Sequence, residues 1–501
     1  MELLANLTLG FDTAFTVTNL LYCFGGVLLG TLIGVLPGLG PVATIAMLLP
    51  ATFALSPVTA LIMLSGIYYG AQYGGSTTAI LINLPGEATS VATTLDGHAM
   101  AKQGRAGVAL ATAAIGSFIA GTFATFVLAA FAPPLAELAL KFGPQEYFSL
   151  MVLGLVVSIV LAHGSLLRAV GMILFGLLLG LVGADVNSGA LRFTFGAPEL
   201  ADGIGFVVVA MGMFGLGEII RNLENEAERQ RLVERITGLM PTREDWKRML
   251  PPIFRGTLLG SALGILPGNG ALLSSFAAYS IEKKISKTPE KFGTGMIEGV
   301  AAPESANNAG AQTSFIPMLT LGIPSSPVMA LMIGALIIQG IQPGPTVITN
   351  QPALFWGIIV SMWIGNVFLV ILNLPLIGMW VRLVTLPYHL LYPAILVFCG
   401  IGVFSLNGST FDIYLMALFG LLGYVFAKLE CEPAPMLLGF LLGPMMEEYL
   451  RRSLLLSRGD ATTFLTRPLS ASLLILALVA LVIVLLPAIS RKRETVFKES
   501  P

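Results

Sequence analysis

Charged residues are scarce in this chain of 501 residues, where they make up only 11% of the sequence. Soluble domains carry about 25% charged residues, and 55% of this chain is hydrophobic, so the composition excludes an ordinary soluble protein. The formal net charge of −1 gives no reason to expect a nucleic acid partner. The composition predicts an integral membrane protein that crosses the lipid bilayer many times.

Cysteine and histidine are equally rare, with three of each. Cys23, Cys399 and Cys431 lack the spacing of a metal or redox site, so neither a metal centre nor a disulfide framework is expected. The sequence also lacks the phosphate-binding Gly-x-x-x-x-Gly-Lys-Ser/Thr motif, the zinc motif His-Glu-x-x-His and the nucleophile elbow Gly-x-Ser-x-Gly. We therefore expect no enzyme activity and no cofactor.

One apolar stretch occurs twice. Residues 28–40 and 258–270 are identical at roughly eight of thirteen positions, and both end in Leu-Pro-Gly-x-Gly. Proline lacks the N–H that a continuous helix needs, and glycine destabilises a helix by about 1 kcal/mol, so each motif interrupts a helix. Paired interruptions in two halves of a membrane chain indicate the substrate site of a secondary transporter. The alternative is a kink used for close helix packing, which we expect for Gly30 and Gly260 upstream of the motifs.

The predicted fold is an all-α polytopic membrane protein with two inverted-topology repeats, each with a re-entrant Leu-Pro-Gly-x-Gly hairpin and broken helices. The predicted parts are a first repeat (1–220), an amphipathic cytoplasmic connector (221–252), a second repeat (253–446) and an extra C-terminal span with a basic tail (447–501). Basic residues place 98–106, 221–252, 281–291 and the C-terminus in the cytoplasm, and 186–203 outside. The side of residues 447–466 stays open.

Small polar residues beside proline and glycine are the candidate substrate ligands. Hydroxyl and amide groups are costly in apolar surroundings unless they are hydrogen-bonded. Half-helix N-termini attract anions, and unwound carbonyls coordinate cations. The alternative is helix packing through small residues. The candidates are Pro37, Gly38, Gly40, Ser76, Thr77, Asn83 and Gly86 in the first half, and Pro267, Gly268, Asn269, Gly270, Asn307, Asn308, Gln312, Thr313 and Ser325 in the second.

Two acidic residues flank these motifs. Glu87 and Glu304 are each either an ion-coupling site or a cap of a half-helix. The segment Asp96-Gly97-His98 is predicted to form a turn in a polar cytoplasmic loop.

Taken together, the motifs resemble the large membrane subunit of tripartite tricarboxylate transporters over nearly the whole chain. Ser325 departs from the pattern, which has glycine after the proline, as at Gly86. The segments that carry the resemblance are 34–41, 84–90, 95–107, 264–270, 298–310, 319–324, 342–345 and 444–453.

The resemblance implies a multi-pass permease of the bacterial inner membrane. Its partners would be a small membrane subunit of about four spans and a periplasmic solute-binding protein that captures a carboxylate such as citrate. Transport would be driven by a Na⁺ or H⁺ gradient, not by ATP. An importer of another small organic anion and, less favoured because of the repeat, a channel are the alternatives. The sequence does not distinguish an elevator from a rocking motion.

Overall fold

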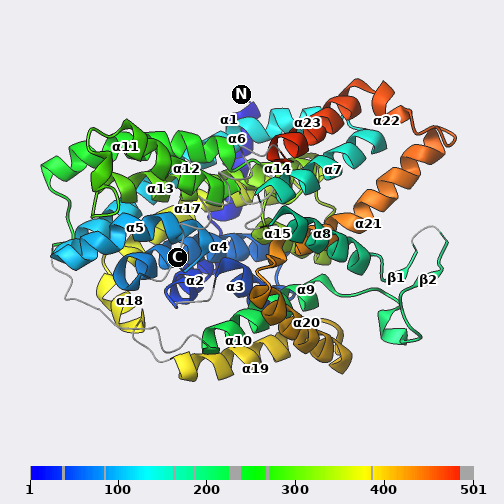
Figure 1. Cartoon of the computed structure of the whole chain (residues 1–501), viewed down its shortest axis with the longest axis horizontal. Helices are drawn as coiled ribbons and strands as arrows, with labels where there is room; N and C mark the ends of the chain where they lie inside the picture. Colours follow the sequence, from blue (N-terminus) through cyan, green and yellow to red (C-terminus); the bar gives the residue numbers. More distant parts are fainter. Residues whose placement is uncertain are drawn as a thin grey trace.

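The fold is seen in a computed structural model that describes residues 2–36, 40–83, 86–161, 165–185, 188–224, 238–266, 270–384 and 388–485. Across these residues nearly all regular structure is helical, and the exception is a two-stranded ribbon of β1 and β2 (Figure 1). The predicted all-α class is therefore confirmed.

The first half contains most of the short helices. Its elements are α1 (Glu2–Ala14), α2 (Val17–Gly34), α3 (Pro41–Leu48), η1 (Pro50–Thr52), α4 (Pro57–Ile82), η2 (Ala88–Ser90), α5 (Val91–Met100), η3 (Ala101–Arg105), α6 (Ala106–Ala139), α7 (Pro144–Leu161), α8 (Leu166–Gly180), β1 (Gly183–Ala184), β2 (Leu191–Arg192), η4 (Pro198–Leu200), α9 (Phe206–Ala210), η5 (Met211–Leu216) and α10 (Gly217–Glu224).

The second half ends in a group of long apolar helices. Its elements are α11 (Arg243–Leu263), α12 (Gly270–Ile285), η7 (Pro289–Lys291), α13 (Glu298–Thr313), α14 (Phe315–Leu321), α15 (Pro327–Ile338), α16 (Thr346–Asn350), α17 (Pro352–Asn373), α18 (Ile377–Val384), α19 (Tyr388–Asn407), α20 (Thr410–Lys428), α21 (Pro433–Leu456), α22 (Thr463–Thr466) and α23 (Pro468–Leu485).

Four helical segments of the described chain are long and apolar enough to cross a membrane: Val17–Gly34, Ala88–Ala139, Pro352–Asn373 and Thr410–Lys428. Shorter apolar helices include α8, α15 and most of α7 and α23.

Helix α11 begins at Arg243 and α21 continues to Leu456, so both helices run across predicted domain boundaries. The domain division itself stays a prediction, and residues 225–237 of the connector lie outside the described residues.

Helices α2 and α4 pack against each other through glycine. A Cβ at Gly26 or Gly30 would lie only 2.3 Å from the carbonyl oxygens of Met63 and Ile67, respectively. The contacting residue numbers rise together along the two helices, so α2 and α4 run parallel. The absence of side chains allows the two backbones to approach closely, as is common between helices in membranes. The predicted packing role of Gly30 is confirmed.

The second half repeats this arrangement in α11 and α13. A Cβ at Gly256 would lie 2.3 Å from the Ala302 oxygen, and one at Gly260 would lie 2.2 Å from the Ala306 oxygen. These helices also run parallel, and the predicted packing role of Gly260 is confirmed as well. The two glycine-mediated pairs thus lie at matching positions of the two copies of the repeated stretch.

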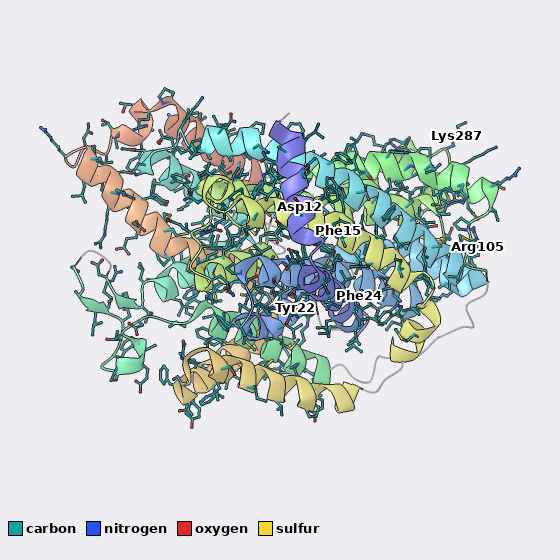
Figure 2. All side chains as sticks on the ribbon, turned by 180° about the vertical axis from the view of Figure 1, so that it is seen from behind. Asp12, Phe15, Tyr22, Phe24, Arg105 and Lys287 are labelled. Carbon is teal, nitrogen blue, oxygen red and sulfur yellow. The ribbon has the colours of Figure 1, made fainter. Side chains whose placement is uncertain are left out.

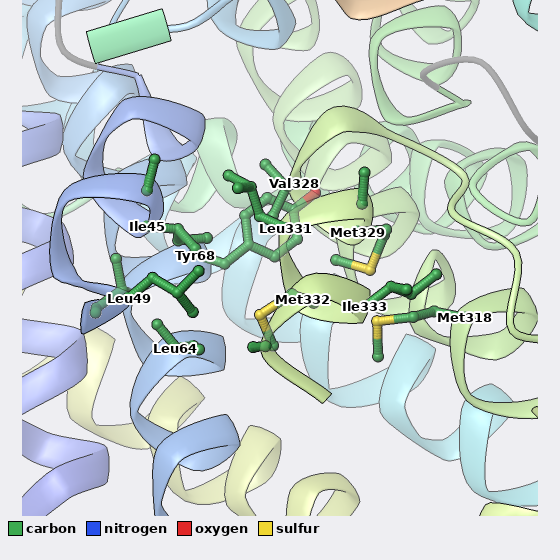
Figure 3. Packing of buried hydrophobic residues seen from close by; sticks show 14 of the residues in the cluster. Ile45, Leu49, Leu64, Tyr68, Met318, Val328, Met329, Leu331, Met332 and Ile333 are labelled. Carbon is green, nitrogen blue, oxygen red and sulfur yellow. The ribbon is translucent and has the colours of Figure 1, made fainter. Parts of the chain in front are cut away.

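The two helix pairs meet in opposite directions. The rings of Tyr68 in α4 and Phe315 in α14 are 6.2 Å apart, and Ser76 further along α4 contacts Glu304 in α13. Residue numbers therefore rise along α4 in the direction in which they fall along α13 and α14, so α4 runs antiparallel to these two helices. Figure 3 shows the adjacent apolar core, in which residues of α3 and α4, such as Ile45 and Leu64, face α15.

The chain reverses in a similar way after α4 and after α14. Both helices end in a residue with left-handed backbone, Asn83 (φ 58°) and Gly322 (φ 70°). After the first reversal, the Gly86 N–H donates to the Gly75 oxygen over 3.4 Å. After the second, the Ser325 hydroxyl donates to the Ser314 oxygen over 3.1 Å. Ser325, which departs from the family pattern, therefore supplies a hydrogen bond from its side chain where Gly86 uses its backbone.

Candidate functional site

A buried carboxylate joins the two halves of the chain. Glu304 of α13 is only 1% exposed. The Ser76 hydroxyl in α4 lies 2.9 Å and 2.8 Å from its two oxygens, and the Thr93 hydroxyl in α5 donates to Oε1 over 2.5 Å. Burying a carboxylate requires compensating hydrogen bonds, and here every one of these donors comes from the other half. Glu304 is therefore held inside the protein and is not a surface cap.

Glu87 makes the reciprocal connection, from the first half to the second. Its half-buried carboxylate accepts from the neighbouring Thr89 hydroxyl and from Asn307 Nδ2 of α13, the latter over 3.4 Å. The Thr89 carbonyl oxygen in turn accepts from the Ser275 hydroxyl of α12 over 2.8 Å. Each half thus contributes one carboxylate that is bound by side chains of the other half.

A small cavity lies beside Glu304. It has room for one water molecule or one small ion but not for a multi-carbon acid. Asn373, at the end of α17, lines the cavity; the residue is 7% exposed and its Oδ1 has no hydrogen-bond partner. Other lining residues include Tyr73, Ser76, Thr77, Ser117 and Glu304. The polar atoms of this lining are predominantly oxygens, which suit a small hard cation or a proton carried by water.

The structure brings several predicted residues to this junction. Ser76, Asn307 and the two carboxylates meet as described, and Thr77 lines the cavity. Asn308 Nδ2 donates to the Ser117 hydroxyl over 2.6 Å, next to Glu304. The Asn307 Oδ1 and Gln312 Oε1 atoms are buried without a hydrogen-bond partner in the described structure, which is costly unless water or a ligand binds them.

Four other predicted residues have positions that are explained by close packing or by a hydrogen bond within their own helix. Gly86 lies where a Cβ would come 2.4 Å from the Gly75 Cα, and Gly40 lies beside Gly86. A Cβ at Gly270 would lie 2.1 Å from the Leu263 oxygen, so this glycine allows α12 to turn back on α11. Thr313 donates to the Ala309 oxygen of its own helix.

Two of the predicted residues that the structure describes take no part in these contacts. Asn83 is exposed and ends α4, whereas Ser325 only closes the second reversal. The motif tips, Pro37, Gly38, Pro267, Gly268 and Asn269, lie outside the described residues, so their roles stay predictions.

Sequence reasoning missed Thr93, Ser117 and Asn373. Thr93 lies in α5, which contains neither proline nor the Leu-Pro-Gly pattern that marked the candidates. Ser117 and Asn373 are polar residues whose neighbours in the chain are apolar, in long apolar helices. The sequence did contain a signal for these residues. An isolated amide or hydroxyl group at membrane depth costs free energy unless a hydrogen-bond partner or a ligand offsets that cost.

The predicted turn at Asp96 is wrong, because residues 91–100 form helix α5 and Asp96 is fully buried. Its Oδ1 accepts three backbone N–H groups, from Gly293, Gly295 and Met296, over 2.7–2.9 Å. Its Oδ2 accepts from the Tyr279 hydroxyl over 2.9 Å. Asp96 therefore fixes the segment between α12 and α13 to the first half of the chain.

Replacing Asp96 with alanine is expected to destabilise the protein by about 3 kcal/mol or more, because it leaves three N–H groups and a hydroxyl buried without an acceptor. Thermal unfolding of the detergent-purified chain measures the effect. Glu290→Ala, which removes the same charge from an exposed position, is expected to unfold like the wild type. Equal unfolding temperatures for both variants would show that the Asp96 contacts contribute little.

A second connection between the halves lies at the same end of the molecule. Arg105, at the end of η3, forms an ion pair of 2.6 Å with Asp245 in the first turn of α11. Burial of the Asp245 carboxyl raises its pKa, but hydrogen bonds from Thr242 and Arg105 outweigh burial and hold the pKa below its usual value. Asp245 therefore stays ionised, and the ion pair persists, at neutral pH.

Comparison with known proteins gives a family match over most of the chain. The profile described as "Tripartite tricarboxylate transporter TctA family" matches residues 20–438. Two curated relatives, both from Agrobacterium vitis, are similar to this chain. The "Uncharacterized 52.8 kDa protein in TAR-I ttuC' 3'region" is 64% identical over 499 residues, covering 100% of this chain and 99% of the relative.

The second relative is the "Uncharacterized protein in TAR-II ttuC' 3'region". It is 64% identical over 240 residues, covering 48% of this chain and 99% of the relative. No solved structure matches the chain.

Proposed function

Because the chain belongs to the tripartite tricarboxylate transporter TctA family, we propose that it is the permease subunit of an ion-gradient-driven importer of a small, citrate-like carboxylate. Membership of a tripartite transporter family implies further subunits. The proposed partners are a small four-span membrane subunit and a periplasmic solute-binding protein that delivers the carboxylate. The proposed location is the bacterial inner membrane, with the C-terminus in the cytoplasm.

The observation that carries this proposal is the reciprocal binding of two carboxylates between the halves. Glu304 is held by Ser76 and Thr93 of the first half, and Glu87 by Asn307 of the second. An ionisable group at membrane depth is a functional candidate by default. Taking up or releasing a cation or proton at Glu304 changes the charge at the contact between the halves, which couples ion binding to their relative position.

We further propose that the two glycine-packed helix pairs are inverted repeats with re-entrant hairpins at the Leu-Pro-Gly-x-Gly motifs. Support comes from the matching parallel pairs and from the opposite directions of α4 and α13. The motif tips precede the first turns of α3 and α12, and helix N-termini favour anions. The carboxylate would bind beside these tips, because the cavity at Glu304 holds only a small ion or water.

The experiment is uptake of radiolabelled citrate into vesicles that contain both membrane subunits, with the binding protein added outside. We expect accumulation that requires a Na⁺ or H⁺ gradient and no ATP. Asn269→Leu and Pro267→Ala are expected to lose uptake while expression is unchanged. Flux that merely equilibrates citrate in either direction would favour a channel. Uptake of another organic anion but not citrate would favour the alternative substrate class.

A further inference from the structure

A two-stranded ribbon extends from the helical body between α8 and α9 (Figure 1). Its strands pair Gly183 with Arg192 and Ala184 with Leu191. We refer to residues 183–185 and 188–203 as the β1–β2 arm. Connections between helices usually run close over the surface, so a segment that projects from the body requires a separate explanation.

The base of the β1–β2 arm is fixed to α21 by charged side chains. The Arg192 guanidinium donates to both carboxylate oxygens of Glu447 over 2.8 Å and 3.2 Å. Arg451 pairs with Glu447 over 2.6 Å and with Asp185 over 3.1 Å. Bidentate and networked pairs hold a geometry better than isolated surface pairs do. The arm is therefore positioned by α21.

The arm also exposes apolar side chains. Leu191 is 59% exposed, Phe193 51% and Phe195 91%. Both phenylalanines have left-handed backbone, with φ of 54° and 50°. Bulky residues rarely adopt this conformation, and where they do, it is often at binding sites. Two exposed aromatic residues therefore share an uncommon backbone conformation.

The β1–β2 arm lies at the end of the molecule opposite the segments that contain Arg105 and Lys287. Figure 2 shows Lys287 and Arg105 at one end of the long axis, with the ribbon at the other. The segments of Arg105 and Lys287 are predicted to face the cytoplasm. Arg192 in the arm and Arg451 beside it are paired with Glu447 and Asp185, so we infer that the arm faces outside. The arm also carries Glu199 and Asp202, both exposed. Carboxylates disfavour contact with anionic lipid headgroups, so this surface suits a soluble protein better than a bilayer.

We propose that the β1–β2 arm is the docking surface for the soluble subunit that delivers the substrate from outside, an inference that rests on the proposed function. Phe193 and Phe195 insert into an apolar pocket of that subunit, since aromatic anchors dominate protein interfaces. Glu199 and Asp202 face a basic rim around the pocket, which speeds association.

The test measures binding of the purified solute-binding subunit to the full-length chain and its small membrane subunit in nanodiscs of neutral lipid. The double variant Phe193→Ser, Phe195→Ser is expected to bind at least tenfold more weakly. The control is Leu465→Ser, an exposed apolar residue that follows α21 in the chain, and it is expected to bind like the wild type. Unchanged affinity of the double variant would overturn the proposal.

A second measurement distinguishes a protein partner from the bilayer. Phe195→Trp fluorescence is expected to shift to the blue when the solute-binding subunit is added and to be insensitive to brominated lipid. Quenching by brominated lipid, with no response to the subunit, would overturn the proposal in favour of membrane contact. Citrate uptake by the wild type tests the proposed function separately, because the binding and fluorescence measurements require no transport.

Discussion

Glu304→Gln is expected to abolish gradient-driven citrate uptake while leaving the protein folded. Glutamine has almost the same volume and can still bond to Ser76 and Thr93, but it can neither be protonated nor neutralise a cation. Removing one partner of a buried charge interaction costs about 3 kcal/mol, which corresponds to a fall in rate of at least about 100-fold. Initial uptake rates in vesicles under an imposed ion gradient measure the effect.

The matched control for Glu304→Gln is Glu290→Gln, the same change at an exposed position, for which uptake is expected to equal that of the wild type. A counterflow assay, in which external labelled citrate exchanges with internal citrate without a gradient, separates coupling from substrate binding. Exchange is expected to survive in Glu304→Gln. Gradient-driven uptake within twofold of the wild type would exclude Glu304 as the coupling group.

Gly30→Leu is expected to prevent stable folding. The added Cβ would lie 2.3 Å from the Ile67 carbonyl oxygen, so α2 and α4 would have to separate along their whole contact. Overpacking a core costs about 1–3 kcal/mol where side chains can yield, and here the obstacle is backbone. Fluorescence-detected size-exclusion chromatography after mild heating measures the loss of the monodisperse peak.

Gly25→Leu is the control for this prediction, because no atom lies within 4 Å of a Cβ at Gly25. Gly25 lies on the same helix as Gly30, and Gly25→Leu is the same chemical change. We expect this variant to leave the peak unchanged. Gly260→Leu, which meets the Ala306 oxygen at 2.2 Å, is expected to behave like Gly30→Leu. If Gly25→Leu and Gly30→Leu were equally stable, close packing of α2 on α4 would not be what holds this region together.

The sequence predicts those features that depend on local chemistry. Proline and glycine interruptions mark the ends of α2 and α11, and the packing roles of Gly30 and Gly260 follow from small residues in apolar helices. Scarcity of ionisable residues singled out Glu304, and the structure places it at the junction of the halves.

The partners of these residues could not be predicted, because they lie far away in the chain. Thr93 and Glu304 are 211 positions apart, and no local pattern links them. Asp96 was misread as part of a turn for the same reason: its polarity suggested exposure, whereas the N–H groups that satisfy it begin 197 positions later. Polarity indicates that a residue needs hydrogen bonds but not whether water or protein supplies them.

The mechanism depends most on the carboxylate binding beside the motif tips. Gly40, which ends the first motif, lies next to Gly86, and the adjacent Glu87 accepts a hydrogen bond from Asn307 of the other half, so Asn307 reports on that site. The direct test of this binding is the rate at which a membrane-permeant thiol reagent labels Asn307→Cys, in a chain without the native cysteines, with and without citrate and the coupling ion. We predict that citrate slows labelling at this position several-fold and leaves labelling of an exposed Glu290→Cys control unchanged. Equal labelling of Asn307→Cys with and without citrate would contradict the account.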